Sequence, residues 1–123
     1  MTQYLFALYG AEDWYDMSTD EWTADMKLHD EFAKAVEAAG AQIVSGAALH
    51  HSRTAAVSDN RGDSPVVTDG PFIETKEALG GFYLVEVRDR AQALELAALC
   101  PVGRVEIRPV LDMSAPPAGQ VAD

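Results

Sequence analysis

The sequence has few basic residues and a single cysteine. It contains 9 lysine and arginine residues against 20 aspartate and glutamate residues, which gives a formal charge of -11. This charge repels phosphate backbones and anionic lipid surfaces, so we expect neither nucleic acid nor a membrane as a direct partner. Cys100 stands alone and has no partner for an internal disulfide. Because a signal peptide and a long apolar run are also missing, we expect a cytoplasmic protein.

Motifs for common cofactors and metals are missing as well. The sequence contains no glycine-rich phosphate loop and no G-x-S-x-G run. His50 and His51 are adjacent, so on an extended segment their side chains point to opposite sides and lack the spacing of a metal site. Cys100 precedes Pro101 at the expected end of a helix, where the helix dipole disfavours a thiolate, which indicates a packing role. We therefore expect no cofactor and no bound metal.

The length of 123 residues, with 48% hydrophobic residues, fits one domain with a modest core. We expect this domain to span residues 1–113. Residues 114–123 include Pro116 and Pro117 and show no apolar periodicity, so we predict a mobile C-terminal tail there.

Strand and helix patterns follow one another in an order typical of α+β domains. Strands are expected at residues 3–9, 41–49, 82–87 and 104–110. A capping box at Ser18 and Glu21 predicts the start of a helix that ends at Gly40. Asp89 predicts the start of a second helix, residues 90–99. Pro109 cannot donate to a ladder, so the last strand should lie at a sheet edge.

Residues 50–81 hold an irregular insertion between two of these strands. Residues 54–58 and 65–68 predict a hairpin, and residues 75–79 predict one helical turn, from which Gly80 and Gly81 would release the chain into the next strand. An aspartate in a turn usually accepts from the N–H two residues on, but after Asp69 that residue is Pro71, which has none. Gly70 is kept out of the α region by Pro71, so a sharp, specified turn is expected, with a purely structural loop as the alternative.

Two runs of this sequence resemble a known family, T-D-G-P-F-I-E-T-K-E-A-L-G-G-F-Y-L-V-E-V and the later V-E-I-R-P-V. They are similar to the YCII-related family, in the branch named for its D-G-P-F motif, and the resemblance covers Tyr4 to Met113. It implies a ferredoxin-like βαββαβ fold with an antiparallel sheet, of the dimeric α/β-barrel type, in which the hairpin predicted above is an insertion before the D-G-P-F turn. The strands at residues 3–9 and 82–87 are apolar on both faces, whereas two helices can cover only one sheet face. We therefore expect a homodimer.

His29 is the first candidate for chemistry. Histidine changes charge near neutral pH, and this one lies in the apolar stripe of the first helix with Asp25 one turn away. The YCII-related family carries a histidine about three turns before the glycine that ends this helix, and the H-x(10)-G spacing from His29 to Gly40 is similar. The same relatives carry Asp-Pro after the second helix, where this chain has Cys100-Pro101. Asp69 or Asp25 would therefore have to supply the acid, and a satisfied core histidine is the alternative.

The residues after the turn supply candidate ligand contacts. We predict that a small-molecule ligand is contacted by Asp25 together with Gly70, Phe72, Glu74 and Lys76. Lys76 is the natural counter-charge for an anionic substrate in so acidic a chain. A solvated loop with a local ion pair is the alternative.

Three functions are compatible with these residues. The first is a cofactor-free acid–base enzyme of the isomerase or lyase type, acting on a small polar or aromatic acid, with His29 as proton carrier and Asp69 within reach as its partner. The second is a non-catalytic ligand-binding or regulatory module linked to transcription, because relatives of this branch often occur beside or fused to sigma factors. The third is a purely structural dimer. A pocket joining His29 and Asp69 would favour the first, and an open apolar patch without them the second.

Overall fold

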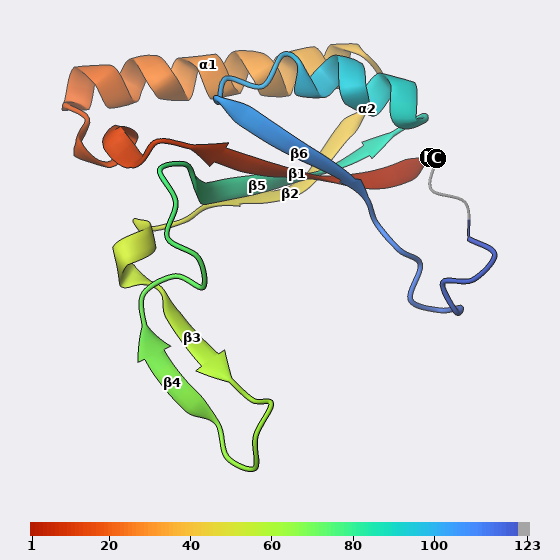
Figure 1. Cartoon of the computed structure of the whole chain (residues 1–123). Helices are drawn as coiled ribbons and strands as arrows, with labels where there is room; N and C mark the ends of the chain where they lie inside the picture. The colour runs from red at the N-terminus through yellow and green to blue at the C-terminus, as the bar shows by residue number, and fades with distance from the viewer. Residues whose placement is uncertain (121–123) are drawn as a thin grey trace.

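The fold is a four-stranded antiparallel sheet with two helices on one face (Figure 1). The computed structural model describes residues 1–120. The sheet has the order β2-β5-β1-β6, built from β1 (Thr2–Gly10), β2 (Gln42–Ala48), β5 (Ala78–Val87) and β6 (Arg104–Pro109). The helices are α1 (Thr19–Ala38) and α2 (Arg90–Ala97). This is the ferredoxin-like arrangement with β1 and β5 in the centre, which confirms the predicted α+β fold.

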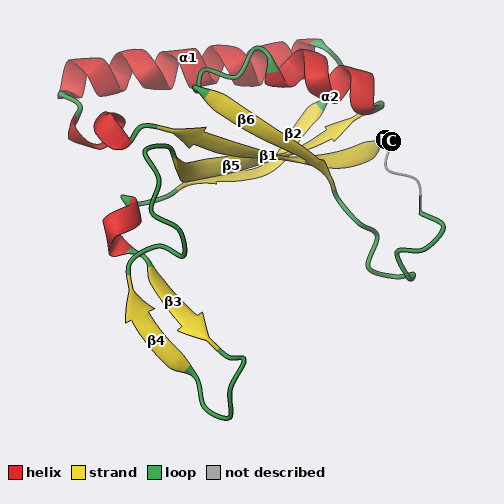
Figure 2. Cartoon of the chain, in the orientation of Figure 1, coloured by secondary structure: helices red, strands yellow, loops and turns green. Residues whose placement is uncertain are grey.

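A hairpin lies between β2 and β5 in the sequence and extends away from the sheet. It consists of β3 (Ala56–Asp59) and β4 (Val66–Asp69), which pair with each other and not with the four-stranded sheet. Two short 3-10 helices, η1 (Glu12–Asp16) and η2 (Ser52–Thr54), lie near its base. Figure 2 shows the hairpin on the side of the sheet opposite the helices, a side that we call the open face.

Local signals set the ends of both helices. The Ser18 hydroxyl accepts from the Glu21 N–H at 3.2 Å and the Ser18 N–H donates back to the Glu21 carboxylate at 3.2 Å, so the predicted capping box is confirmed. Gly40 follows α1 with a φ of 78°, the left-handed conformation of a helix stop. In α2 the Asp89 side chain accepts from the Gln92 N–H at 2.9 Å. This helix ends at Ala97, two residues earlier than the predicted Leu99.

The core lies between the helices and the sheet. Alternate residues of β1 and β5 point toward the helices, as the pleat requires. The buried apolar side chains include Tyr4, Phe6 and Leu8 of β1, Val85 and Val87 of β5, Phe32 and Val36 of α1, and Ala93 and Leu96 of α2. The intervening residues of the two central strands, Leu5, Ala7 and Tyr9 of β1 and Phe82 and Leu84 of β5, belong to the open face.

The prediction of a helical turn at residues 75–79 is wrong. Ala78 and Leu79 already belong to β5, and Gly80 and Gly81 are part of the strand. A Cβ on Gly81 would lie 2.6 Å from the carbonyl oxygen of Ala47 in β2. The glycine therefore allows close approach of the neighbouring strand and does not release the chain from a helix.

The last strand, β6, is followed by an irregular segment. β6 is an edge strand, which confirms the position predicted from Pro109. After it, the Gln120 amide donates to the Asp112 carbonyl at 2.8 Å, and the Asp112 N–H donates to the Gln120 side chain at 3.0 Å. The mobility of residues 114–123 stays a prediction, and residues 121–123 lie outside the described part. Within residues 1–120, neither helix has the length and apolar composition needed to cross a bilayer.

Candidate functional site

His29 lies on the inner side of α1 between two polar partners. Its Nδ1 is 2.7 Å from the hydroxyl of Tyr83 in β5, and its Nε2 is 3.8 Å from the carboxylate of Asp25, one helical turn earlier. The ring of Tyr83 also packs on Phe32, with 5.2 Å between ring centroids. The predicted meeting of Asp25 and His29 is therefore observed, and the two residues form a three-group chain with Tyr83.

The environment of Tyr83 determines which of these three side chains holds each proton. Burial first, and then the electrostatic effects of Cys100, Asp25 and Asp30 in their ionised forms, raise the pKa of the Tyr83 phenol above its ordinary value. The phenol therefore keeps its proton at neutral pH and can donate it to His29 Nδ1. In the neutral imidazole, the remaining N–H then lies on Nε2, which faces Asp25. Nδ1 is thus hydrogen-bonded to Tyr83, whereas the 3.8 Å between Nε2 and the Asp25 carboxylate is longer than a hydrogen bond.

Cys100 adjoins this group as part of the core. It belongs to the buried core cluster against which Tyr83 packs. Burial raises the pKa of Cys100 to about 12, which keeps the thiol neutral and unreactive at physiological pH. The position where the resemblance implies an aspartate therefore lies in the core cluster that Tyr83 contacts and carries a neutral side chain in this protein.

The structure does not bring Asp69 to His29. Asp69 is the last residue of β4 and pairs with Ala56 in the hairpin. The hairpin lies beyond the open face (Figure 1), whereas His29 on α1 contacts Tyr83, which alternates with the core residues Val85 and Val87 of β5. The predicted proximity of the two side chains is therefore wrong within one chain, because the insertion carries the D-G-P-F turn away from the sheet.

The turn itself has the expected sharp geometry. Gly70 has a φ of 97°, in the region that favours glycine, and its N–H donates to the Ala55 carbonyl at 2.7 Å. Beyond it, Phe72 and Glu74 are exposed to solvent. Among the predicted ligand contacts after the turn, only Lys76 lines the pocket described next.

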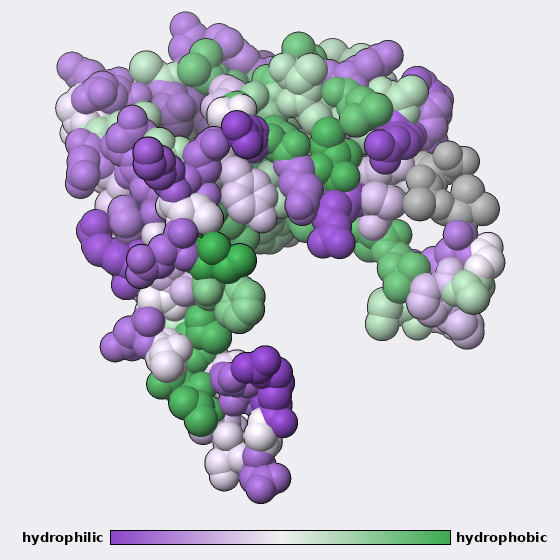
Figure 3. Space-filling model, in the orientation of Figure 1, coloured by the Kyte–Doolittle hydropathy of each residue, from purple (hydrophilic) through white to green (hydrophobic). Residues whose placement is uncertain are grey.

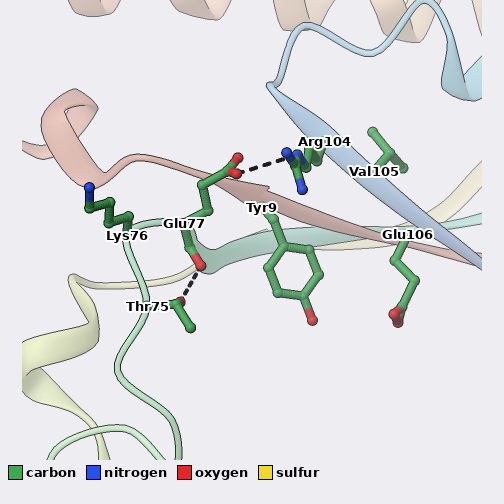
Figure 4. Close-up of a pocket in the computed structure, with 7 residues that line it drawn as sticks. All are labelled: Tyr9, Thr75, Lys76, Glu77, Arg104, Val105 and Glu106. Atoms are coloured by element: carbon green, nitrogen blue, oxygen red, sulfur yellow. Dashed lines mark hydrogen bonds and ion pairs between the residues drawn. The ribbon is translucent and has the colours of Figure 1, made fainter.

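A pocket of about 540 Å³ opens at the end of the sheet near this loop. It is lined by Tyr9 of β1, by Thr75, Lys76 and Glu77 of the loop, and by Arg104, Val105 and Glu106 of β6 (Figure 4). Tyr9 and Glu106 extend from neighbouring strands to the same side of the sheet. Glu77 holds Arg104 in an ion pair with 3.3 Å between the guanidinium and the carboxylate.

The pocket combines charge of both signs with an aromatic ring. Arg104 supplies a guanidinium, Glu77 and Glu106 two carboxylates, and Tyr9 a flat ring with a polar tip, whereas the ammonium group of Lys76 points away from Tyr9 (Figure 4). Sequence reasoning missed Tyr9 and the β6 residues. For Tyr9, Arg104 and Glu106 the signal was the alternation of the two strands, which turns these side chains away from the core, whereas Val105 packs against it.

A second polar cluster joins η1 to η2 at the base of the hairpin. The Glu12 carboxylate accepts from the Ser52 N–H at 2.7 Å and from the Ser52 hydroxyl, and it lies 3.6 Å from His51 Nδ1. Burial raises the pKa of Glu12, but the Ser52 hydrogen bonds and the charges of His51 and Arg53 outweigh it and hold this pKa below its ordinary value. These bonds fix η2 on η1. Within the described residues, no three His, Cys, Asp or Glu side chains are grouped so as to hold a metal ion.

Comparison with known proteins gives a family and one partial relative. The model of the YCII-related domain matches residues 2–114. An uncharacterised protein of Rhizobium meliloti (strain 1021) is 44% identical over 50 residues, which cover 37% of this chain and 40% of that protein. The chain thus matches less than half the length of this curated relative. The domain match, by contrast, includes both helices, the whole sheet and the hairpin, so this chain belongs to the family of YCII-related proteins.

Proposed function

We propose that this YCII-related protein is a ligand-binding module that takes a small carboxylic acid in the pocket at Tyr9 and Arg104. The observation that carries the proposal is that Arg104, Lys76 and Tyr9 line one open pocket of about 540 Å³. Pockets of this volume suit small molecules, and a few placed polar groups orient the ligand. In so acidic a chain, Lys76 and Arg104 are the natural attraction for an anion.

The two acidic residues of the pocket set its selectivity. Glu77 holds the guanidinium of Arg104, so this cation is oriented before a ligand arrives. Glu106 lines the same pocket and repels a second negative charge on the ligand. Tyr9 offers its ring to an aromatic or aliphatic body. The preferred ligand is therefore a monocarboxylic acid with a flat apolar part.

An enzyme is the second candidate, and the Tyr83–His29–Asp25 chain is the observation in its favour. In that reading His29 carries a proton with Asp25 as its acidic partner, in place of Asp69. We rank it second because Nδ1 of the imidazole is already hydrogen-bonded to Tyr83. The pocket at Tyr9 also contains none of these three residues.

We further infer that the working form is a cytoplasmic homodimer in which the open faces pack on each other. Leu5, Phe82 and Leu84 are only partly covered on this face of the two central strands. Apolar central strands normally have both faces covered, and here the helices cover one. Such a dimer can report a bound acid to a transcription regulator, in line with the relatives that occur beside or fused to sigma factors.

Titration calorimetry with three aromatic probes tests the binding proposal. We expect benzoate to bind, and benzamide and phthalate to bind at least tenfold more weakly, because one lacks the charge and the other adds a second. Arg104→Gln and Lys76→Gln should each weaken benzoate binding about tenfold or more, which corresponds to about 1.4 kcal/mol. The control Lys27→Gln removes an exposed cation of α1 and should have no effect.

The same titrations separate the two candidate functions. A ligand-binding module keeps its benzoate affinity in His29→Gln and leaves the acid chemically unchanged. No binding of benzoate by the wild type, or binding that neither pocket variant weakens, would overturn the proposal. Turnover of an acid that His29→Gln abolishes would establish the enzyme instead.

A further inference from the structure

The hairpin and the loop after it expose large apolar side chains. We call residues 56–73 the arm. Four of its apolar residues are well exposed, with exposed fractions of 59% for Val66, 66% for Val67, 83% for Phe72 and 66% for Ile73. Figure 3 shows apolar atoms along the hairpin and its loop, beside the hollow beneath the sheet. A projecting apolar surface of this kind marks an interaction site more often than a solvated loop.

The arm is placed to meet whatever covers the open face. It leaves the sheet at the end where β2 stops and β5 begins and runs past the open face (Figure 1). Two sheets packed face to face lie about 10 Å apart. A second sheet on the open face would therefore lie alongside the arm.

The charges of the open face favour a second copy of this chain as the partner. Two chains of charge -11 repel each other unless the surfaces that meet are balanced. The polar positions of the open face include Glu106 and Arg108 of β6 and Glu86 of β5, together with Arg104 of β6, which is already paired with Glu77 of the same chain. In a two-fold interface the same patch faces itself, so a patch with both signs is self-complementary.

We propose that the arm of each protomer packs on the second copy and buries Phe72 and Ile73 against it. This inference rests on the homodimer of the proposed function and adds a segment that the open faces alone do not require. The loop residues that follow the arm, Thr75 to Glu77, line the pocket. A partner that holds Phe72 and Ile73 therefore also fixes the loop that presents Lys76, so that dimerisation completes the binding site.

Cross-linking between isotopically distinct protomers tests this contact. Phe72→Cys is labelled with benzophenone maleimide in a dimer that mixes unlabelled and ¹⁵N-labelled chains. Because Cys100 is buried, the reagent attaches at position 72. On irradiation, we expect cross-linked peptide pairs in which one member is light and the other heavy. The control Leu28→Cys, on a half-exposed position of α1, should give few such mixed pairs. Cross-links confined to one protomer would overturn the proposal.

Sedimentation and calorimetry distinguish the ways in which the proposals can fail. We expect Phe72→Ser with Ile73→Ser to raise the dimer dissociation constant at least 100-fold and to weaken benzoate binding. The control, Leu28→Ser with Leu94→Ser, also removes two exposed apolar side chains, from α1 and α2, and should do neither. An unchanged dimer in the arm variant would overturn the arm contact alone. A wild type that stays monomeric would overturn the dimer and the arm together, whereas benzoate binding by that monomer would leave the ligand-binding module standing.

Discussion

The imidazole Nδ1 of His29 and the hydroxyl of Tyr83 lie 2.7 Å apart and join the inner side of α1 to the central strand β5. This is a partly buried hydrogen bond between elements far apart in the sequence. It orients the ring of the histidine that the sequence singled out. It also gives that histidine a structural role that needs no ligand.

Loss of this bond should be measurable as stability. We expect Tyr83→Phe to lower the free energy of unfolding by about 1 kcal/mol, the usual net value of one hydrogen bond. A double-mutant cycle with His29→Leu, followed by urea unfolding, should give a coupling energy of similar size. Tyr15→Phe is the control. Tyr15 makes a 2.7 Å hydrogen bond to His50 at an exposed site, so this variant should lose less stability than Tyr83→Phe. A coupling energy of zero would contradict the structural role.

Loss of the Tyr4 hydroxyl, unlike loss of the Tyr83 hydroxyl, should not destabilise the protein. The Tyr4 side chain is fully buried, and within the described residues its hydroxyl has no hydrogen-bond partner. Tyr4→Phe removes an unsatisfied polar group and keeps the ring, so the stability should stay unchanged or rise by about 1 kcal/mol. Thermal unfolding of Tyr4→Phe and Tyr83→Phe under the same conditions compares the stabilities of the two variants. A loss of stability as large as that of Tyr83→Phe would mean that the Tyr4 hydroxyl has a partner.

Alkaline pH should destabilise the protein through Cys100. Burial raises the pKa of this thiol from 9.0 to about 12, so the unfolded chain loses the proton in a range where the folded chain keeps it. The stabilisation is complete below pH 9 and falls by about 1.4 kcal/mol per pH unit as the pH rises toward 12. Tyr83 acts in the same direction above pH 10, because its pKa is raised from 10.0. Urea unfolding at several pH values should show a shallower fall for Cys100→Ala, and parallel slopes would contradict the burial argument.

Two glycines should differ in what a methyl group costs. In Gly81→Ala the new Cβ would lie 2.6 Å from the Ala47 carbonyl, so β2 must shift, at about 3 kcal/mol. Gly70→Ala meets no atom within 4 Å and is strained only by its φ of 97°, which should cost about 1–3 kcal/mol. Pro71→Ala should cost less than Gly70→Ala. Amide hydrogen exchange should locate the damage in the sheet for Gly81→Ala and in the hairpin for Gly70→Ala, and damage confined to the hairpin in both would be unexpected.

Local chemistry made the helices predictable from the sequence. Ser18 and Glu21 satisfy the first backbone groups of α1 by themselves, so their pattern needs no knowledge of the rest of the fold. Gly40 likewise acts through its own backbone. The alternation of apolar residues gave the central strands, and the absence of an N–H on Pro109 gave the edge position of β6.

Long-range geometry was harder to predict. Asp69 and His29 each have a suggestive local setting, but the direction of the hairpin decides whether they meet, and no local pattern encodes that direction. Gly80 and Gly81 looked like a break between elements, because the carbonyl of Ala47 that requires a glycine comes from a distant strand. Tyr83 was open to prediction, since it alternates with Val85 and Val87 and its hydroxyl needs a polar partner near the core.

The insertion between β2 and β5 leaves the sheet and returns to it at neighbouring paired positions of these two strands. Ala48 pairs with Gly81, and the Leu49 N–H donates to the Gly80 carbonyl at 2.8 Å. The entropy of closing such a loop grows slowly with its length, so the segment can lengthen, shorten or change its sequence at little cost to the strands that anchor it. The same domain can therefore acquire new partners by replacement of this one insertion, while the helices, the sheet and the contact between His29 and Tyr83 stay unchanged.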